Sequence, residues 1–186
     1  MSYAHTSHAP LPRDPYAGLP ELPSFELTST DIVEGGTAPE SMLSALFGVP
    51  GGADRSPQLA WSGFPEETKS FVVSCYDPDA PTPSGFWHWC LSNVPAHVTE
   101  LAADTNAAEL PAGTLVHRND ASAPGFVGCA PPAGHGPHRY IFTVTAVDVD
   151  ALDITEDATP AVVAFNLFSH GIARATLTVT YEEPAA

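Results

Sequence analysis

The sequence is poor in positive charge. Of its 186 residues only six are lysine or arginine, against 22 aspartates and glutamates, which gives a formal net charge of −16. A nucleic-acid-binding surface and a polybasic membrane-binding patch both require clustered Lys and Arg. The sequence therefore excludes nucleic acid as a partner, and a site for an anion has to use histidine, a single arginine or backbone N–H groups.

The chain also lacks the sequence signals of a secreted protein and of an integral membrane protein. It has no paired-cysteine motif of the kind that binds zinc or carries out redox chemistry. Residues 1–10 contain neither a basic segment nor an apolar run, both of which a signal peptide needs. No stretch approaches the ~20 apolar residues of a membrane span. The three cysteines, Cys75, Cys90 and Cys129, form no CxxC pair. We expect a cytoplasmic protein that is not an integral membrane protein, with free, mostly buried thiols and no cofactor.

Proline and glycine are abundant, with 20 and 14 residues, and they predict many turns and few long helices. The hydrophobic fraction of 44% is sufficient for a packed core of one domain. Residues 1–22 contain four prolines and little periodicity, which predicts an extended N-terminal arm. Residues 23–186 are expected to form a single domain.

Runs of β-forming residues predict a mostly β fold. One helix is predicted over residues 159–173, because Thr159 can serve as N-cap and Pro160 as the first helical residue of an apolar stripe. The strands are separated by long irregular loops without regular βα alternation, which favours antiparallel sheets. Strands are predicted at 24–30, 58–61, 70–76, 86–94, 114–118, 138–149 and 175–181.

Two segments join a rigid Pro- or Gly-rich loop to the end of a strand. The first runs over 77–82 as DPDAPT and leads to His88 in the sequence WHW. The second runs over 128–140 as GCAPPAGHGPHRY. Rigid loops at strand ends commonly carry binding sites, so these two segments are the candidates for functional chemistry.

Strand alternation assigns directions to the side chains in these segments. His138 and Tyr140 share one face of a strand and can line a pocket, whereas Arg139 faces away and favours a structural ion pair. Asp77 follows a buried strand, so its carboxylate needs a partner such as histidine. His88 is expected to face opposite its two tryptophan neighbours. Together these groups suggest a phosphate cradle; the alternative is satisfied core histidines beside a plain Asp-Pro turn.

The two segments resemble the signature motifs of the phosphatidylethanolamine-binding protein family, also called Raf-kinase-inhibitor-like, in its bacterial form. The resemblance covers about residues 22–182, and the segments at 56–61 and 165–175 are similar to those of actinobacterial and mycobacterial members. It implies two antiparallel sheets packed together with a few peripheral helices. It also implies a pocket that takes small anions such as phosphate, acetate or the phosphoethanolamine headgroup.

The resemblance further implies a set of site residues and partners. His135 is additional to the motif of many members and is expected at the pocket rim. Bacterial members imply a homodimer, and animal members imply regulation of a kinase or another partner protein. The implied ligand-binding residues are Asp77, Pro81, His88, Ala130, Pro131, His138 and Tyr140, with Asp79, Gly128, Gly134 and Arg139 in supporting roles.

Two other functions stay open from the sequence. A hydrolase could use a serine or cysteine with a histidine in the same pocket; Cys90 is expected on the face of His88, although no Gly-x-Ser-x-Gly elbow exists. A zinc site could use His135 and His138 with a third ligand, but these histidines flank a loop–strand junction rather than a helix face. We favour a binding protein that is not an enzyme and holds no metal.

Overall fold

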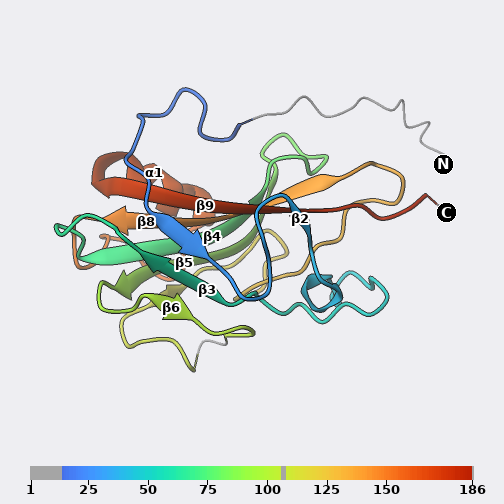
Figure 1. Cartoon of the computed structure of the whole chain (residues 1–186), viewed down its shortest axis with the longest axis horizontal. Helices are drawn as coiled ribbons and strands as arrows, with labels where there is room; N and C mark the ends of the chain where they lie inside the picture. Colours follow the sequence, from blue (N-terminus) through green and yellow to red (C-terminus); the bar gives the residue numbers. More distant parts are fainter. Residues whose placement is uncertain (1–13, 106–107, 186) are drawn as a thin grey trace.

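The computed structural model describes residues 14–105 and 108–185. These residues form two β-sheets with one α-helix late in the chain (Figure 1). The larger sheet has six strands in the order β2-β9-β8-β4-β5-β7, and the smaller has three in the order β1-β3-β6. The prediction of a mostly β fold with two sheets is confirmed.

Four long strands make up the centre of the larger sheet, and all pair antiparallel with their neighbours. The short edge strand β2 pairs in parallel with β9, which is an exception to the predicted antiparallel arrangement. The larger sheet consists of β2 (Gly36–Thr37), β4 (Ser70–Asp77), β5 (Phe86–Pro95), β7 (Leu115–Val116), β8 (His138–Val147) and β9 (Gly171–Tyr181). The smaller consists of β1 (Glu26–Thr28), β3 (Leu59–Ser62) and β6 (Glu100–Leu101).

The main core lies between the two sheets. Trp61 of β3 meets Phe71 of β4 with ring centroids 5.4 Å apart, and Phe142 and Val144 of β8 are fully buried in the same cluster. Burial of such large side chains contributes roughly 1.5–3 kcal/mol each to the free energy of folding. This packing holds β4, β5 and β8 as a rigid platform, and the two candidate segments are attached at one end of it.

The helix α1 (Pro160–His170) begins as predicted, with the Thr159 side chain accepting a hydrogen bond from the Val162 N–H at 3.3 Å. It ends before residue 173, because Gly171 already belongs to β9. The apolar stripe was predicted to consist of Val162, Phe165, Leu167, Phe168 and Ile172. Leu167 packs with the buried Val163 as expected, whereas Val162, Phe165 and Phe168 are 45%, 81% and 69% exposed. No helix of the described chain is long and apolar enough to cross a bilayer.

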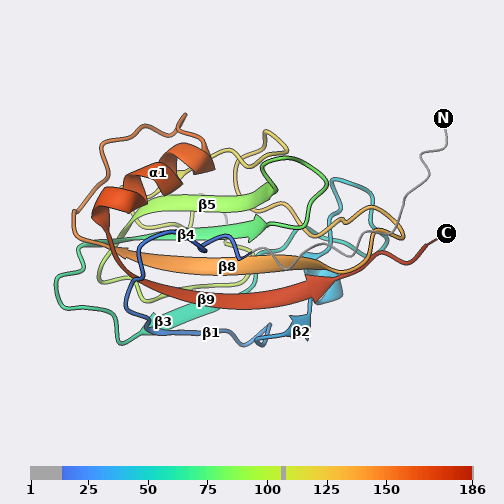
Figure 2. The same cartoon turned by 90° about the horizontal axis from the view of Figure 1, so that it is seen from above.

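Residues 14–22 of the predicted arm lie against the larger sheet, on the side that carries α1 (Figure 2). The Tyr16 hydroxyl and the Thr143 hydroxyl form a hydrogen bond of 2.6 Å. The backbone N–H of Arg174 donates to the Pro23 carbonyl at 2.9 Å. Residues 1–13 of the arm lie outside the described residues. The division into an arm and a single domain at residue 22 stays a prediction.

Candidate functional site

A cavity of about 240 Å³ opens where β4 ends and where β5 and β8 begin. The strand register brings these ends together, since Asp77 pairs with Phe86 and Tyr76 pairs with Ile141. All the predicted ligand residues except Pro131 line this cavity. Pro131 is buried, and Pro132 lines the cavity instead.

Asp77 and His138 form the centre of the site. The Nδ1 atom of His138 lies 2.7 Å from Oδ2 of Asp77, and the two side chains are only 1% and 4% exposed. The other carboxylate oxygen of Asp77 accepts from the N–H groups of Asp79 at 2.7 Å and Ala80 at 3.0 Å. Because Nδ1–H donates to Asp77, the ring of His138 is held in one tautomer with Nε2 on the opposite side.

His135 extends this pair into a chain of three groups. Its Nδ1 lies 2.7 Å from Nε2 of His138, so a neutral His138 accepts from His135, and a protonated His138 donates to it. The flanking glycines, Gly134 and Gly136, have φ values of 72° and 96°, a conformation that side chains rarely adopt. Gly134 also donates its N–H to the Glu183 carbonyl at 2.9 Å. The loop thus presents His135 to His138, while the His135 side chain itself stays half-buried and outside the cavity lining.

A β-bulge aims His88 into the cavity. Successive residues of β4, Cys75 and Tyr76, pair with Trp89 and Trp87, so His88 is an extra residue in β5. The two tryptophans therefore face opposite sides of the sheet, and the expectation that they share a face was wrong. Because of this extra residue, Cys90 points to the side of the larger sheet that carries α1, away from His88. Period-two alternation fails here because the bulge adds one residue.

The His88 ring is buried between Phe86 and Tyr140, with ring centroids 4.7 and 5.0 Å away. Its Nδ1–H donates to the Val127 carbonyl at 2.8 Å. Burial lowers the pKa of His88, although the bond to Val127 and the charge of Asp77 oppose this. His88 is therefore neutral at physiological pH, and its Nε2 is a hydrogen-bond acceptor rather than a cation.

The Tyr140 hydroxyl has no hydrogen-bond partner within bonding geometry among the described residues, although the side chain is only 1% exposed. Its polar neighbours are the backbone of Ala130 and the Cys129 thiol. Burial raises the pKa of Tyr140, so the phenol keeps its proton. An unpaired buried hydroxyl costs about 1–3 kcal/mol; a ligand in the cavity could remove this cost.

The predicted supporting residues connect the two segments. Arg139 donates to both carboxylate oxygens of Asp79, from Nη2 and Nε, each at 2.7 Å. Burial alone would raise the pKa of Asp79, but the hydrogen bonds from Arg139 lower it. Gly128 lies against the Met42 carbonyl, and a Cβ at this position would be 2.4 Å from that oxygen. Only glycine allows this close approach.

Five residues that line the cavity were missed by sequence reasoning. Phe47 forms part of the wall 6.3 Å from Phe86 between ring centroids, and it comes from a loop that carries no motif. Phe86 could have been found, because it follows the first loop directly and lies near His88. The others are Ala80, Thr82 and Pro132.

Within the described ranges, no three His, Cys, Asp or Glu side chains are grouped so that they could hold a metal ion. Asp77, His138 and His135 instead form a line of hydrogen bonds, in which each contact joins two protein groups. This arrangement suits proton sharing and hydrogen bonding to a ligand.

A family model described as Phosphatidylethanolamine-binding protein matches residues 28–182. The chain belongs to the phosphatidylethanolamine-binding protein family. Both signature segments and every residue of the cavity fall within the matched range. The narrower likeness to actinobacterial members stays a prediction, as do the homodimer and the regulation of a kinase or other partner protein.

This family member is similar to two proteins of Escherichia coli. It is 43% identical to the UPF0098 protein YbcL over 162 residues, which cover 86% of this chain and 88% of YbcL. It is 42% identical to the UPF0098 protein YbhB over 159 residues, which cover 84% of this chain and 99% of YbhB. These names assign membership of a protein group and no activity.

Solved structures agree with the fold. The crystal structure of E. coli YbcL, described as a new member of the mammalian PEBP family, has a TM-score of 0.81 and covers 86% of this chain and 98% of its own. A putative phosphatidylethanolamine-binding protein homolog from Chlamydia trachomatis has a TM-score of 0.73 at 29% identity, with 86% and 98% coverage. The overall fold of this chain is therefore shared with these two solved structures.

Proposed function

We propose that this protein binds a small phosphate-bearing anion, free or as a phosphoethanolamine headgroup, in the cavity between His88, His138 and Tyr140. The observation that carries the proposal is the buried Tyr140 hydroxyl, which has no hydrogen-bond partner within the described chain and belongs to a side chain that lines the cavity. A phosphate oxygen at this position would accept the phenol proton in a hydrogen bond.

The donors and acceptors of the cavity favour a phosphate that keeps one proton. A neutral His88 offers an acceptor at Nε2, which a P–OH group can satisfy. Tyr140 donates to an unprotonated oxygen. Acetate could use the donors, but its ionised form has no hydroxyl for His88.

The hydrolase alternative receives less support from the contacts. The described residues that line the cavity include no serine or cysteine. Cys75, Cys90 and Cys129 are all buried, and burial raises the pKa of each thiol, which disfavours the nucleophilic thiolate. We therefore propose binding rather than catalysis at this site.

The test is an NMR titration of the histidine ring signals with phosphoethanolamine, with inorganic phosphate and acetate as separate ligands. We expect saturable shifts at His88 and His138 together, and an affinity about tenfold lower in Tyr140→Phe. His97 is exposed and follows the opposite end of β5 from His88, so His97→Gln is the matched control. Equal binding by Tyr140→Phe and the parent would place the ligand elsewhere.

A further inference from the structure

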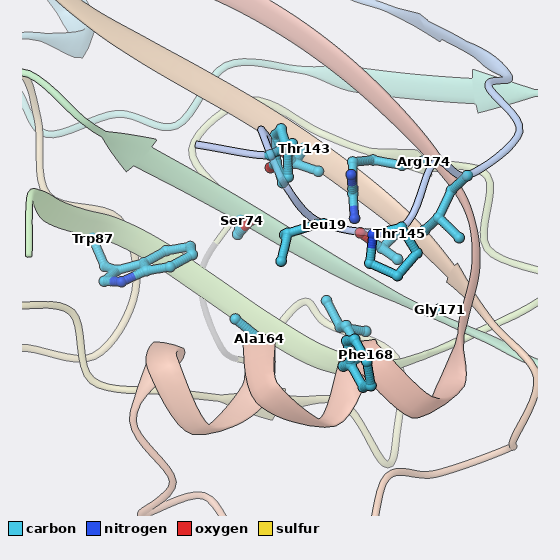
Figure 3. A pocket seen from close by; sticks show the side chains of 13 residues that line it. Leu19, Ser74, Trp87, Thr143, Thr145, Ala164, Phe168, Gly171 and Arg174 are labelled. Atoms are coloured by element: carbon cyan, nitrogen blue, oxygen red, sulfur yellow. The ribbon is translucent and has the colours of Figure 1, made fainter. Parts of the chain in front are cut away.

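A second cavity, of about 100 Å³, lies on the opposite face of the larger sheet, between the arm and α1 (Figure 3). Strand alternation separates the two cavities: Tyr140 of β8 lines the first, whereas Thr143 and Thr145 of β8 line the second. Figure 3 shows Ala164 and Phe168 reaching it from α1 and Arg174 reaching it from β9.

The floor of this cavity is polar, although β8 is a central strand whose face is covered here. The register places Ser74 of β4 opposite Thr143, and Arg174 of β9 opposite Thr145. Three hydroxyl groups and one guanidinium therefore form adjacent cross-strand pairs on one face. A covered sheet face that served packing alone would carry apolar side chains at these positions.

Most of these polar groups have no partner. The Thr143 hydroxyl is paired with Tyr16 at 2.6 Å. The side chains of Ser74 and Thr145, in residues only 8% and 2% exposed, make no hydrogen bond with any described residue. The Arg174 guanidinium stacks on the Tyr16 ring, 4.0 Å from its centroid, and forms no ion pair within the described chain.

Arg174 is unusual among the basic residues of this chain, because it lines a cavity but its guanidinium forms no ion pair within the described residues. Aspartate and glutamate outnumber Lys and Arg by 22 to six, yet Arg174 lies in a cavity with hydroxyl groups instead of a carboxylate. A guanidinium that lies over a ring face in this way can still use its N–H groups for hydrogen bonds. These groups match a carboxylate, which they can bind through two parallel bonds.

The other walls are apolar. Leu19 of the arm, Trp87 of β5, and Leu167 and Phe168 of α1 line the cavity together with Arg174, and Leu19 and Phe168 are themselves 49% and 69% exposed. A dry cavity of about 150 Å³ holds benzene, so this cavity suits a carboxylic acid of about four carbons. The polar floor and the apolar walls together define an amphipathic ligand.

We propose that this second cavity binds a small aliphatic carboxylate. The carboxylate would lie against Arg174, with Thr145 and Ser74 donating further hydrogen bonds, and the alkyl chain would lie between Leu19, Trp87 and Phe168. Because the arm closes one side, the ligand would also hold residues 16–22 against the sheet. This site shares no residue with the phosphate cavity, and it does not depend on that proposal.

The experiment is a calorimetric and methyl-NMR titration of the full chain with butyrate and with its neutral isostere, butyramide. We expect saturable shifts of the Leu19 and Ala164 methyl signals with butyrate, and binding of butyramide at least tenfold weaker. Arg174→Gln should lose the preference for butyrate. Arg118 is exposed and donates to the Ser122 carbonyl. Arg118→Gln is therefore the control, because it removes the same charge from a residue outside the cavity, and it should bind butyrate as the parent protein does.

Two further variants keep the test decisive. Thr145→Val preserves the shape of the side chain and should weaken butyrate binding severalfold, even if loss of Arg174 loosens the arm. His138→Gln alters the first cavity and should leave butyrate binding unchanged. Equal binding of butyrate and butyramide, no binding of either at millimolar concentration, or loss of butyrate binding in His138→Gln would each overturn the proposal.

Discussion

The carboxylate of Asp77 and the imidazole of His138 are 61 positions apart in the chain, and they meet in a buried hydrogen bond of 2.7 Å. One oxygen of Asp77 sets the tautomer of His138, while the other holds the turn that begins at Asp79. A single side chain therefore shapes the first loop and orients the histidine of the second. The first prediction tests this double role.

Asp77→Asn should lower the free energy of unfolding by about 1–3 kcal/mol, since a buried charge-assisted hydrogen bond is replaced by a weaker one. The amide would donate to Nδ1 and move the proton of His138 to Nε2, which reverses the bond to His135. Urea denaturation and the histidine NMR signals measure both effects. Asp150 is exposed, so Asp150→Asn is the control; an Asp77→Asn protein with parental stability and signals would contradict the assignment.

Arg139→Gln should destabilise the protein at neutral pH by about 1–3 kcal/mol, because it leaves the buried Asp79 carboxylate without its ion pair. The pKa of Asp79 is lowered in the folded state. The stability that this provides is present above the unfolded pKa of about 3.9, and it is lost as the pH falls through the lower folded value. The difference between parent and variant should therefore shrink below about pH 4. Urea denaturation over a pH series measures it, and a constant difference would count against the ion pair.

The buried histidines should make the protein less stable in mild acid. Burial lowers the pKa of His88 and of His117 in the folded state, so the unfolded chain binds protons first, near pH 6.5. Stability should fall as the pH decreases from about 7 towards the lowered folded values. His88→Gln should reduce the slope of this fall, measured as the free energy of unfolding at several pH values. An unchanged slope would mean that His88 protonates freely in the folded state.

The thiols of Cys75, Cys90 and Cys129 should be unreactive in the folded protein. All three are buried, and burial raises their pKa values, so the reactive thiolate is scarce. A chromogenic thiol reagent at pH 8 should label none of them within minutes, and all three after unfolding in urea. Rapid labelling of any one in the native state would reveal local opening at that strand or loop.

Local patterns in the sequence determined much of this protein. The strands over β4, β8 and β9 follow from β-forming runs, and α1 starts at the N-cap and proline that its sequence predicts. The alternation of His138, Arg139 and Tyr140 placed two side chains in the cavity and the third in the ion pair with Asp79. These features depend on neighbours within a few residues, and the chain encodes them directly.

Only the tertiary structure decided which distant groups meet. The pairing of Asp77 with His138, the wall formed by Phe47 and the bulge that turns His88 inward all depend on strand register and on contacts across long stretches of chain. The meeting of Arg174 with Tyr16 above a polar sheet face depends on how the arm crosses β8. No local periodicity carries this information, because burial and register are set by the packing of the whole domain.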